Sequence, residues 1–281
     1  MSGVLYVVAT PIGNLADASP RALEVLRKAD LIACEDTRVT RTLLARNGIE
    51  TPTAALHEHN ERAAAGKLLN LLKEGRDIAL VSDAGTPALS DPGALLVARA
   101  HAAGIRVSPV PGPSAAAAAF SAAGFPADRF VFAGFLPAAK AARAKALAAL
   151  ELDCPLILYE APHRILETMQ DLAERFGPER EIAIGRELTK KFEEVARTTL
   201  RDAPAWLGAD PQRIQGEFVL VIAAGKPKAP AEADAERTLE ALLEVMAPSE
   251  AARLAARITG LPRRQLYQKA LLYQRSIRRA K

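Results

Sequence analysis

The chain has 281 residues, of which 49% are hydrophobic and 25% are charged, the balance of an ordinary globular protein. This length allows two domains with separate cores, and the composition excludes a disordered chain, a collagen-like repeat and a small disulfide-rich scaffold. No apolar run is long enough to span a membrane, and we expect neither a signal peptide nor a membrane segment. Cys34 and Cys154 have no metal-ligand spacing, which predicts a reducing, cytoplasmic location without a structural zinc site.

The charge is unevenly distributed along the chain. The formal net charge is +4, yet the segment from residue 250 onward carries nine Lys or Arg residues against the single acidic residue Glu250. The remainder of the chain is therefore mildly acidic. A basic C-terminal segment of this kind predicts a polyanionic partner such as nucleic acid, with a merely solubilising tail as the alternative.

The N-terminal part alternates short apolar runs with helical patterns. Ser19 is expected to cap a helix that starts at Pro20, and Asn60 a helix that runs to Glu74 and ends at Gly75. Strands are expected at 4–9, 31–34, 78–81 and 107–110. This alternation predicts βα units and a mainly parallel sheet.

A similar alternation resumes after about residue 125, with a helix expected at 164–176. Strands are expected at 130–136, 155–159, 181–188 and 216–225. A small, proline-rich linker follows at 226–234, and only helical patterns lie beyond it. Ser249 can cap the first of these helices, Gly260 breaks it and Pro262 can start the next, which predicts a helix-turn-helix.

Several familiar site patterns are absent from the sequence. It has no P-loop, no GxGxxG after the first strand, no GxSxG and no HExxH. The absence of these motifs argues against four classes of protein: kinases, P-loop NTPases, simple NAD enzymes and α/β-hydrolases. The remaining signals lie in loops at the carboxyl ends of predicted strands, where open α/β sheets place their ligands.

Three of these loops are candidates for binding a small ligand. The loop at 10–14 makes a tight turn, which on its own is more typical of a plain βα connection. In the next loop, Asp83 can accept hydrogen bonds from an amine or a ribose hydroxyl, and Gly85 exposes its backbone. Ser114 opens an alanine-rich helix whose free N–H groups suit an anion, with ordinary helix packing as the alternative.

Two further loops, 159–164 and 186–191, gather Arg, His, Lys and Glu at neighbouring strand ends. Such residues can bind phosphates and position a hydroxyl, and a surface salt-bridge network is the alternative. His57 and His59 have no evident third ligand, so we expect no metal site.

Seven segments, read in this order, resemble the small-subunit ribosomal RNA cytidine 2′-O-methyltransferases: LYVVATPIGNLAD, CEDTR, VSDAGTPALSDPG, PVPGPSA, YEAPHR, GRELTK and GEFVLVI. That family belongs to the tetrapyrrole methylase superfamily. The likeness covers residues 4 to about 225, and ITGLPRRQLYQKAL resembles the family's helical tail. It implies two α/β domains, 1–112 and 113–225, with S-adenosylmethionine in the cleft between them. It also implies a homodimer with a basic, RNA-binding helical segment at 235–281.

The resemblance implies as acceptor the ribose 2′-hydroxyl of a cytidine in small-subunit ribosomal RNA. Carried over position by position, it places these residues around the methyl donor: Pro11, Asp83, Gly85, Thr86, Ser114, Ala115 and Tyr159. Tetrapyrrole-modifying relatives carry GxGxGD-like glycines after the first strand. This chain has TPIGN there, which favours the RNA branch.

A ribose hydroxyl is a weak nucleophile at neutral pH, so a base would help the transfer. The candidates are Glu160, Glu187 and Lys190, the last only if burial or neighbouring Arg186 lowered its pKa. We expect a further set of basic side chains to contact the RNA substrate: Arg38, His163, Arg164, Arg186, Arg263, Arg264 and Lys269.

Three alternative functions remain open on the sequence. The same fold can methylate a tetrapyrrole or another small acceptor, which would leave the basic tail without a role. A non-catalytic RNA-binding protein is a second alternative, against which the intact ligand loops argue. A magnesium-dependent nucleotide phosphohydrolase is the third, but no helical E-x-x-E array supports it.

Overall fold

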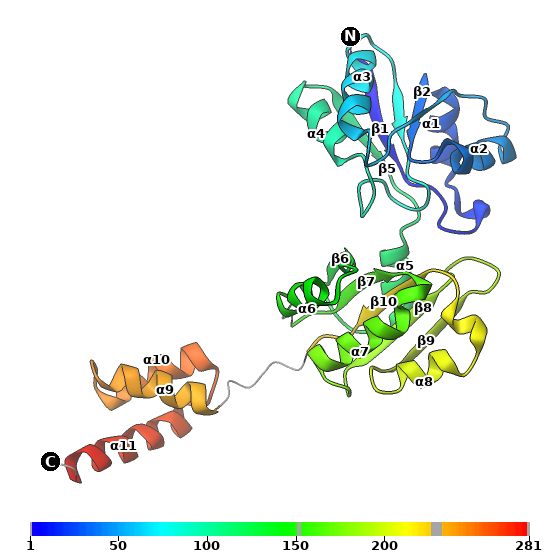
Figure 1. The fold of residues 1–281 in the computed structure, drawn as a ribbon. Helices are drawn as coiled ribbons and strands as arrows, with labels where there is room; N and C mark the ends of the chain where they lie inside the picture. Colours follow the sequence, from blue (N-terminus) through cyan, green and yellow to red (C-terminus); the bar gives the residue numbers. More distant parts are fainter. Residues whose placement is uncertain (1, 151–152, 226–231, 280–281) are drawn as a thin grey trace. The chain divides into compact units, whose positions relative to one another are not determined.

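The computed structural model describes residues 2–150, 153–225 and 232–279. Residues 1–224 form one compact unit and residues 225–281 a second one. The first unit contains two five-stranded sheets, each with its own helices, and the second is helical (Figure 1). Within the described ranges, no helix has the length and apolarity needed to cross a bilayer.

The first sheet is entirely parallel, as the sequence predicts. Its order is β3-β2-β4-β1-β5, with Leu5 opposite both Ile78 and Val107. The strands are β1 (Val4–Val8), β2 (Leu31–Cys34), β3 (Thr53–Ala55), β4 (Ile78–Leu80) and β5 (Arg106–Val110). The sheet is covered by α1 (Pro20–Lys28) and α2 (Thr37–Arg46) on one face and by α3 (Glu61–Lys73) and α4 (Ala94–Ala102) on the other. A short 3-10 turn, η1 (Leu15–Asp17), follows β1.

The predicted helix starts are confirmed at one position and wrong at another. Ser19 Oγ accepts a hydrogen bond from Ala22 N at 3.1 Å, and Pro20 is the first residue of α1. Asn60 precedes α3 but does not cap it, because its side-chain oxygen accepts from the N–H of His57 at 2.9 Å. The Asn60 side chain therefore closes the preceding loop rather than the helix end.

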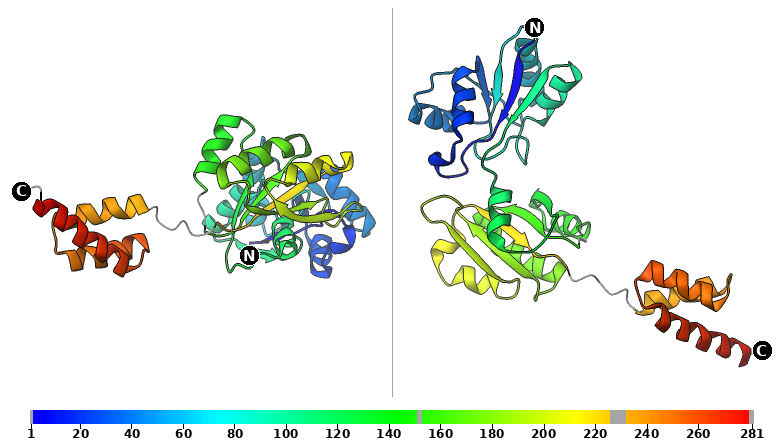
Figure 2. Two further views of the ribbon diagram at one scale, coloured as in Figure 1. Left: turned by 90° about the horizontal axis from the view of Figure 1, so that it is seen from below. Right: turned by 180° about the vertical axis from the view of Figure 1, so that it is seen from behind.

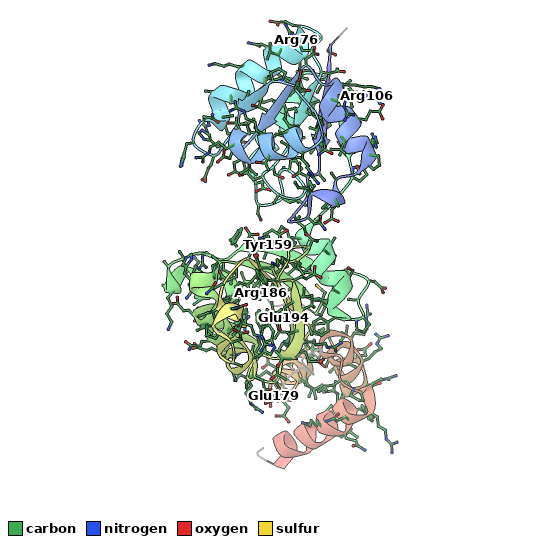
Figure 3. All side chains as sticks on the ribbon, turned by 90° about the vertical axis from the view of Figure 1, so that its right-hand side faces the viewer. Arg76, Arg106, Tyr159, Glu179, Arg186 and Glu194 are labelled. Atoms are coloured by element: carbon green, nitrogen blue, oxygen red, sulfur yellow. The ribbon has the colours of Figure 1, made fainter. Side chains whose placement is uncertain are left out.

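The second sheet is mixed, whereas the resumed alternation suggested more βα units. Its order is β6-β7-β10-β8-β9, and among the described strands only β6 and β7 pair in parallel. The strands are β6 (Val131–Phe135), β7 (Leu156–Glu160), β8 (Glu181–Arg186), β9 (Glu194–Thr199) and β10 (Phe218–Ile222). β8 and β9 form a hairpin without a crossover helix, which forces them to be antiparallel. In Figure 3, Arg186 and Glu194, which pair across this hairpin, lie close together.

Helices cover both faces of this second sheet. α5 (Ala115–Ala123) packs on one face, while α6 (Lys140–Ala148), α7 (Ile165–Phe176) and α8 (Ala203–Gly208) share the core on the other. Two 3-10 turns, η2 (Pro162–Arg164) and η3 (Pro211–Ile214), complete the connections. Because α5 packs on the second sheet, it supports the predicted domain boundary near residue 112, which stays a prediction.

The C-terminal unit consists of α9 (Glu232–Leu243), α10 (Pro248–Thr259) and α11 (Arg263–Arg279), which two further views show packed together (Figure 2). Small residues such as Ala251 and Ala255 fill its core together with Leu239 and Leu266. The predicted helix-turn-helix is confirmed, with Gly260 ending α10 in a left-handed conformation at φ +73°.

Two details of the prediction for this unit are revised. Ser249 lies inside α10, because the helix already starts at Pro248 and its capping position is Ala247. The predicted linker at 226–234 is too long, because α9 begins at Glu232. Its remaining residues, 226–231, lie outside the described residues.

Candidate active site

A cavity of about 430 Å³, the principal candidate site, lies within the first unit and is lined by loops of both sheets. The first sheet contributes the loops that follow β1, β4 and β5, at the carboxyl ends of its three adjacent strands β4, β1 and β5. Open parallel sheets bind their ligands at this edge. The cavity brings together seven of the residues predicted from the sequence: Asp83, Gly85, Thr86, Ser114, Ala115, Tyr159 and Glu160.

Hydrogen bonds tie the three loops of the first sheet to one another. The backbones of Thr10 and Gly85 exchange two hydrogen bonds, of 2.8 and 3.0 Å. Thr86 Oγ1 donates to the carbonyl of Pro113 at 3.1 Å. Gly85 has φ +87°, and a Cβ there would lie 3.4 Å from the side chain of Ile12. The three loops therefore form one rigid wall of the cavity.

Four residues other than glycine have left-handed backbones within the described ranges: Ala88, Ser90, Glu187 and Thr189. Two belong to the loop after β4 and two to the loop after β8. Both loops contribute to the cavity lining, through Leu89, Ser90 and Asp91 in the first case and Leu188 in the second. The unusual backbone is thus concentrated at the cavity.

Carboxylates crowd the first-sheet side of the cavity. Asp83 Oδ1 accepts a hydrogen bond from the N–H of Asp36 at 2.9 Å. Burial, with the nearby charges of Glu35 and Asp83, raises the pKa of Asp91 to about 6. Burial and the charge of Asp83 also raise the pKa of Glu35. This acidic wall is suited to a positively charged ligand.

Asp91 lines the cavity but is not among the residues predicted to surround the donor. Asp91 belongs to the same predicted ligand loop as Asp83, but the composition of the loop does not indicate that its carboxylate is half-buried beside other acids. The usable signal was its spacing, eight residues after Asp83 in the same loop at a strand end. Asp91 also lies close enough to Tyr159 for its charge to raise the pKa of that phenol, although burial is the larger cause.

Both carboxylate oxygens of Glu160, a predicted base, accept hydrogen bonds. Its side chain is buried, Oε1 accepts from the N–H of Ala161 at 2.8 Å and Oε2 accepts from Thr168 Oγ1 at 2.5 Å. Arg164 Nε lies 3.4 Å from Oε1. This carboxylate secures the end of β7, and its geometry favours a positioning role over proton transfer.

Glu187 and Lys190, the other predicted bases, form an ion pair of 2.8 Å beside the cavity. Burial lowers the pKa of Lys190, but its hydrogen bonds to Glu187 and Glu217 outweigh that effect and raise the pKa overall. The lowered pKa on which its role as a base depends is therefore not found. Burial raises the pKa of Glu187, but Lys190 and the N–H of Glu217 together lower it, so this carboxylate is ionised at neutral pH.

The predicted phosphate-binding residues differ in their availability. Arg186 is buried and donates from Nε to the carbonyl of Gln215 and from Nη1 to that of Phe192, so it secures backbone. Arg164 donates to the carbonyl of Leu136 at 2.8 Å. Arg38 is 86% exposed and pairs with Asp36, and His163 is exposed. The last two are open to a substrate.

Pro11 does not line the principal cavity, and the predicted C-terminal residues belong to the separate helical unit. Pro11 lines a smaller neighbouring cavity, which Asp83 also borders. Arg263 and Arg264 are exposed at the start of α11 in the helical unit, and Lys269 pairs with Glu236 at 2.5 Å. In the part of the chain that the structure describes, no group of three or more His, Cys, Asp or Glu residues could hold a metal ion.

Solved structures with this fold act on very different substrates. A uroporphyrin-III C-methyltransferase from Thermus thermophilus matches with a TM-score of 0.57 at 24% identity, covering 79% of this chain and 94% of that one. A diphthine synthase matches with a TM-score of 0.59 at 16% identity, over 79% of this chain and 90% of that one. At these identities the likeness defines the fold, that of the tetrapyrrole methylases.

Sequence comparisons define the family. The model of the tetrapyrrole (corrin/porphyrin) methylases matches residues 4–204, and the RsmI C-terminal HTH domain matches residues 229–275. A protein of Pseudomonas aeruginosa named ribosomal RNA small subunit methyltransferase I is 50% identical, over 97% of this chain and 98% of its own length. The protein of that name from Escherichia coli O157:H7 is 48% identical over 97% and 96%. The chain belongs to the tetrapyrrole methylases, S-adenosylmethionine-dependent methyltransferases, and within them to the group of ribosomal RNA small subunit methyltransferases I.

Proposed function

We propose that this protein transfers a methyl group from S-adenosylmethionine to the ribose 2′-oxygen of a cytidine in small-subunit ribosomal RNA. The observation that carries the proposal is the acidic cavity, on which the predicted ligand loops converge in a chain of this family. The coarser part, methylation of small-subunit ribosomal RNA, draws support from relatives with that name over nearly the whole chain.

The cavity fits the methyl donor in charge and in lining. When bound, S-adenosylmethionine supplies an electrophilic methyl group on a positively charged sulfur. Asp83 and Asp91 present negative charge on one side, and Leu89, Leu188 and Val219 add apolar surface. We assign Asp83, Gly85, Thr86, Ser114, Ala115 and Tyr159 to the donor site, with Asp91 added to the residues predicted from sequence.

The protein's principal task is to bring the 2′-oxygen in line with the methyl group. The C–S bond of the donor breaks as the new C–O bond forms, and the hydroxyl proton passes to a base. Positioning two reactants in this way can supply about 7–11 kcal/mol in favourable cases. The loops joined through Thr10, Gly85 and Thr86 provide a rigid frame for it.

Among the predicted bases, the geometry favours Glu187. It is ionised at neutral pH and partly exposed, whereas Lys190 is held protonated and Glu160 is enclosed. We expect Glu187→Gln to lower kcat more than Glu160→Gln does. Full turnover in Glu187→Gln would remove it from this role.

The helical unit supports RNA as the acceptor over a tetrapyrrole or other small molecule. It carries exposed Arg263 and Arg264 and matches the C-terminal domain of the RNA-directed relatives. Lysine and arginine contacts to phosphates supply affinity and register rather than base choice. A non-catalytic RNA-binding protein would not need the acidic wall built around Asp83 and Asp91.

We also propose that the protein acts in the cytoplasm as a homodimer. The ribosomal RNA substrate and the absence of a disulfide between buried Cys34 and Cys154 support the location. Phe192, just before the edge strand β9, and Val195, within it, are 57% and 43% exposed, which supports self-association. The mass of the protein in solution tests the dimer.

The decisive experiment measures transfer of labelled methyl from S-adenosylmethionine to small ribosomal subunits that lack native modification. Nucleoside analysis should recover the label as 2′-O-methylcytidine. Asp83→Asn should reduce transfer, whereas Asp17→Asn, an exposed control, should not. If the protein binds the donor but no label enters RNA, the acceptor is a small molecule rather than RNA. If the protein does not bind the donor, the assignment of the cavity as the donor site is wrong.

A further inference from the structure

A groove of about 1,040 Å³ lies in the first unit, between loops of the two sheets. One wall comes from the first sheet and consists of the turn after β1, the start of η1 and the end of α2. The other wall is the loop that follows β8. Pockets for drug-sized ligands have volumes of roughly 300–1,000 Å³. The larger volume of this groove indicates an extended partner rather than a small molecule.

The groove is basic, although the chain before residue 250 has more acidic than basic residues. Of the described residues that line it, none is acidic and three are cationic: Arg46, Lys190 and Lys191. Arg46 and Lys191 are exposed, and neither forms an ion pair with another described residue. Uncompensated positive charges along one groove attract a polyanion.

Two of the cations at the groove differ in how much charge they contribute. Arg27, exposed on α1, donates from Nη2 to the carbonyl of Asn47, a lining residue, at 3.3 Å. The ammonium of Lys190 bonds to carboxylate oxygens of Glu187 and Glu217, at 2.8 Å each. Arg27 therefore adds to the positive charge at the groove, whereas Lys190 adds little.

Close contacts join the two walls of the groove. The N–H of Asn14 donates to Thr189 Oγ1 at 3.1 Å. A Cβ on Gly13 would lie 2.4 Å from Cγ of Lys190 and 3.0 Å from the carbonyl oxygen of Leu188, so the turn after β1 needs glycine here. The backbone of Thr189 is left-handed, at φ +64°. These contacts hold the groove in shape before a partner binds.

The groove and the donor cavity share both loops. Ile12 lines the donor cavity, and the next residue, Gly13, lines the groove. Leu188 and Thr189 divide between the cavity and the groove in the same way. A strand that lies in the groove therefore reaches the donor cavity beside the loop that carries Glu187, the favoured base.

We infer that this groove holds the phosphate backbone of the ribosomal RNA next to the target cytidine, with Arg46 and Lys191 contacting its phosphates. The inference rests on the proposed function, and it adds a contact surface to that of the C-terminal helices. Phosphate contacts fix the register and orientation of a nucleic acid without reading its sequence. The groove thus sets where the strand lies relative to the methyl donor. A second copy of this chain is the competing occupant.

The test measures binding of the full-length protein to small ribosomal subunits that lack native modification, over a series of salt concentrations. S-adenosylhomocysteine is present, so that no turnover occurs. Arg46→Ala combined with Lys191→Ala should weaken binding about 25-fold at about 0.1 M salt and lower the log–log salt slope by about 1.4, the values for two phosphates of a single strand. The affinity for S-adenosylmethionine should not change, because neither residue lines the donor cavity.

Two further double variants complete the design. Lys73→Ala with Arg76→Ala removes the same two charges from exposed positions at the amino edge of the first sheet, before β4, and should change neither affinity nor slope. In Figure 3, Arg76 lies far from Tyr159 of the donor cavity. Arg46→Lys with Lys191→Arg keeps both charges in the groove and should retain the wild-type slope.

Three results would overturn the inference while wild type still binds and methylates small subunits. The first is a wild-type affinity and salt slope in the variant with alanine at 46 and 191, and the second is an equal loss in the Lys73 and Arg76 control. The third is a lower mass of the groove variant in solution, which would make the groove a contact between copies of this chain. A wild-type protein that neither binds nor methylates small subunits would instead refute the proposed function, and this inference with it.

Discussion

Asp91→Asn should make the protein more stable at neutral pH while weakening its hold on the methyl donor. The pKa of Asp91 rises from 3.8 to about 6 because of burial and the charges of Glu35 and Asp83. A shift of about two pK units corresponds to at most about 3 kcal/mol. Because the side chain is only half-buried, solvent screening reduces this to about 1–2 kcal/mol. Asparagine carries no charge, so the variant avoids the free-energy cost of an ionised, half-buried carboxylate.

The pH dependence gives the sign of the effect. The native state holds the Asp91 proton more tightly than the unfolded chain does. The contribution of Asp91 to the free energy of unfolding therefore falls as pH rises from about 4 to about 6, and it stays low above that range. Wild type and Asp91→Asn should differ in urea unfolding at pH 7 and converge near pH 4, with exposed Asp17→Asn as control.

The same residue should control donor binding. Calorimetry should show the affinity of wild type for S-adenosylmethionine rising between pH 5 and pH 7 as Asp91 ionises, because a carboxylate attracts the positively charged donor. The affinity of Asp91→Asn should be lower and nearly independent of pH in this range. A variant that is less stable than wild type at pH 7, or that keeps the wild-type pH profile, would refute this account.

Three more predictions concern stability, cavity shape and RNA binding. Arg143→Met should lower the free energy of unfolding, measured in urea, by about 3–5 kcal/mol, because buried Asp171 loses its ion-pair partner. Adding Asp171→Leu should restore most of this stability. An equal loss in the double variant would show that the unpaired Asp171 is not the cause. Gly134→Ala should weaken donor binding in calorimetry, because its Cβ would lie 2.4 Å from Ser90 Oγ at the cavity and its φ is +60°; unchanged affinity would contradict it. Replacing Arg263 and Arg264 together by alanine should lower the log–log salt slope of RNA binding by about 1.4 if each contacts one phosphate of a single strand, and an unchanged slope would exclude them.

The sequence was sufficient for most of the first sheet and for the ligand loops. Strands β1, β2 and β4 are short apolar runs, and Ser19 and Pro20 mark the start of α1 by local chemistry. Glycine and proline show where the loops lie. The loops converge on one cavity because the strand order places β4, β1 and β5 side by side.

Strand pairing in the second sheet and the protonation states of side chains could not be predicted from the sequence in this way. The hairpin of β8 and β9 depends on which strands meet, and β9 alternates exposed and partly buried residues rather than forming an apolar run. Arg186 has the chemistry of a phosphate ligand, but tertiary contacts use its guanidinium to hold two carbonyl groups. The pKa values of Lys190 and Asp91 depend on neighbours distant in sequence, such as Glu217 and Glu35.

The left-handed backbones of Ala88, Ser90, Glu187 and Thr189 have a cost that the rest of the fold must offset. Conformations of this kind cost of the order of 1–3 kcal/mol for each residue. The protein thus gives up stability to hold two loops in shape before any ligand arrives. A ligand that enters this preorganised cavity has little loop entropy to remove, so more of its contact energy remains as affinity.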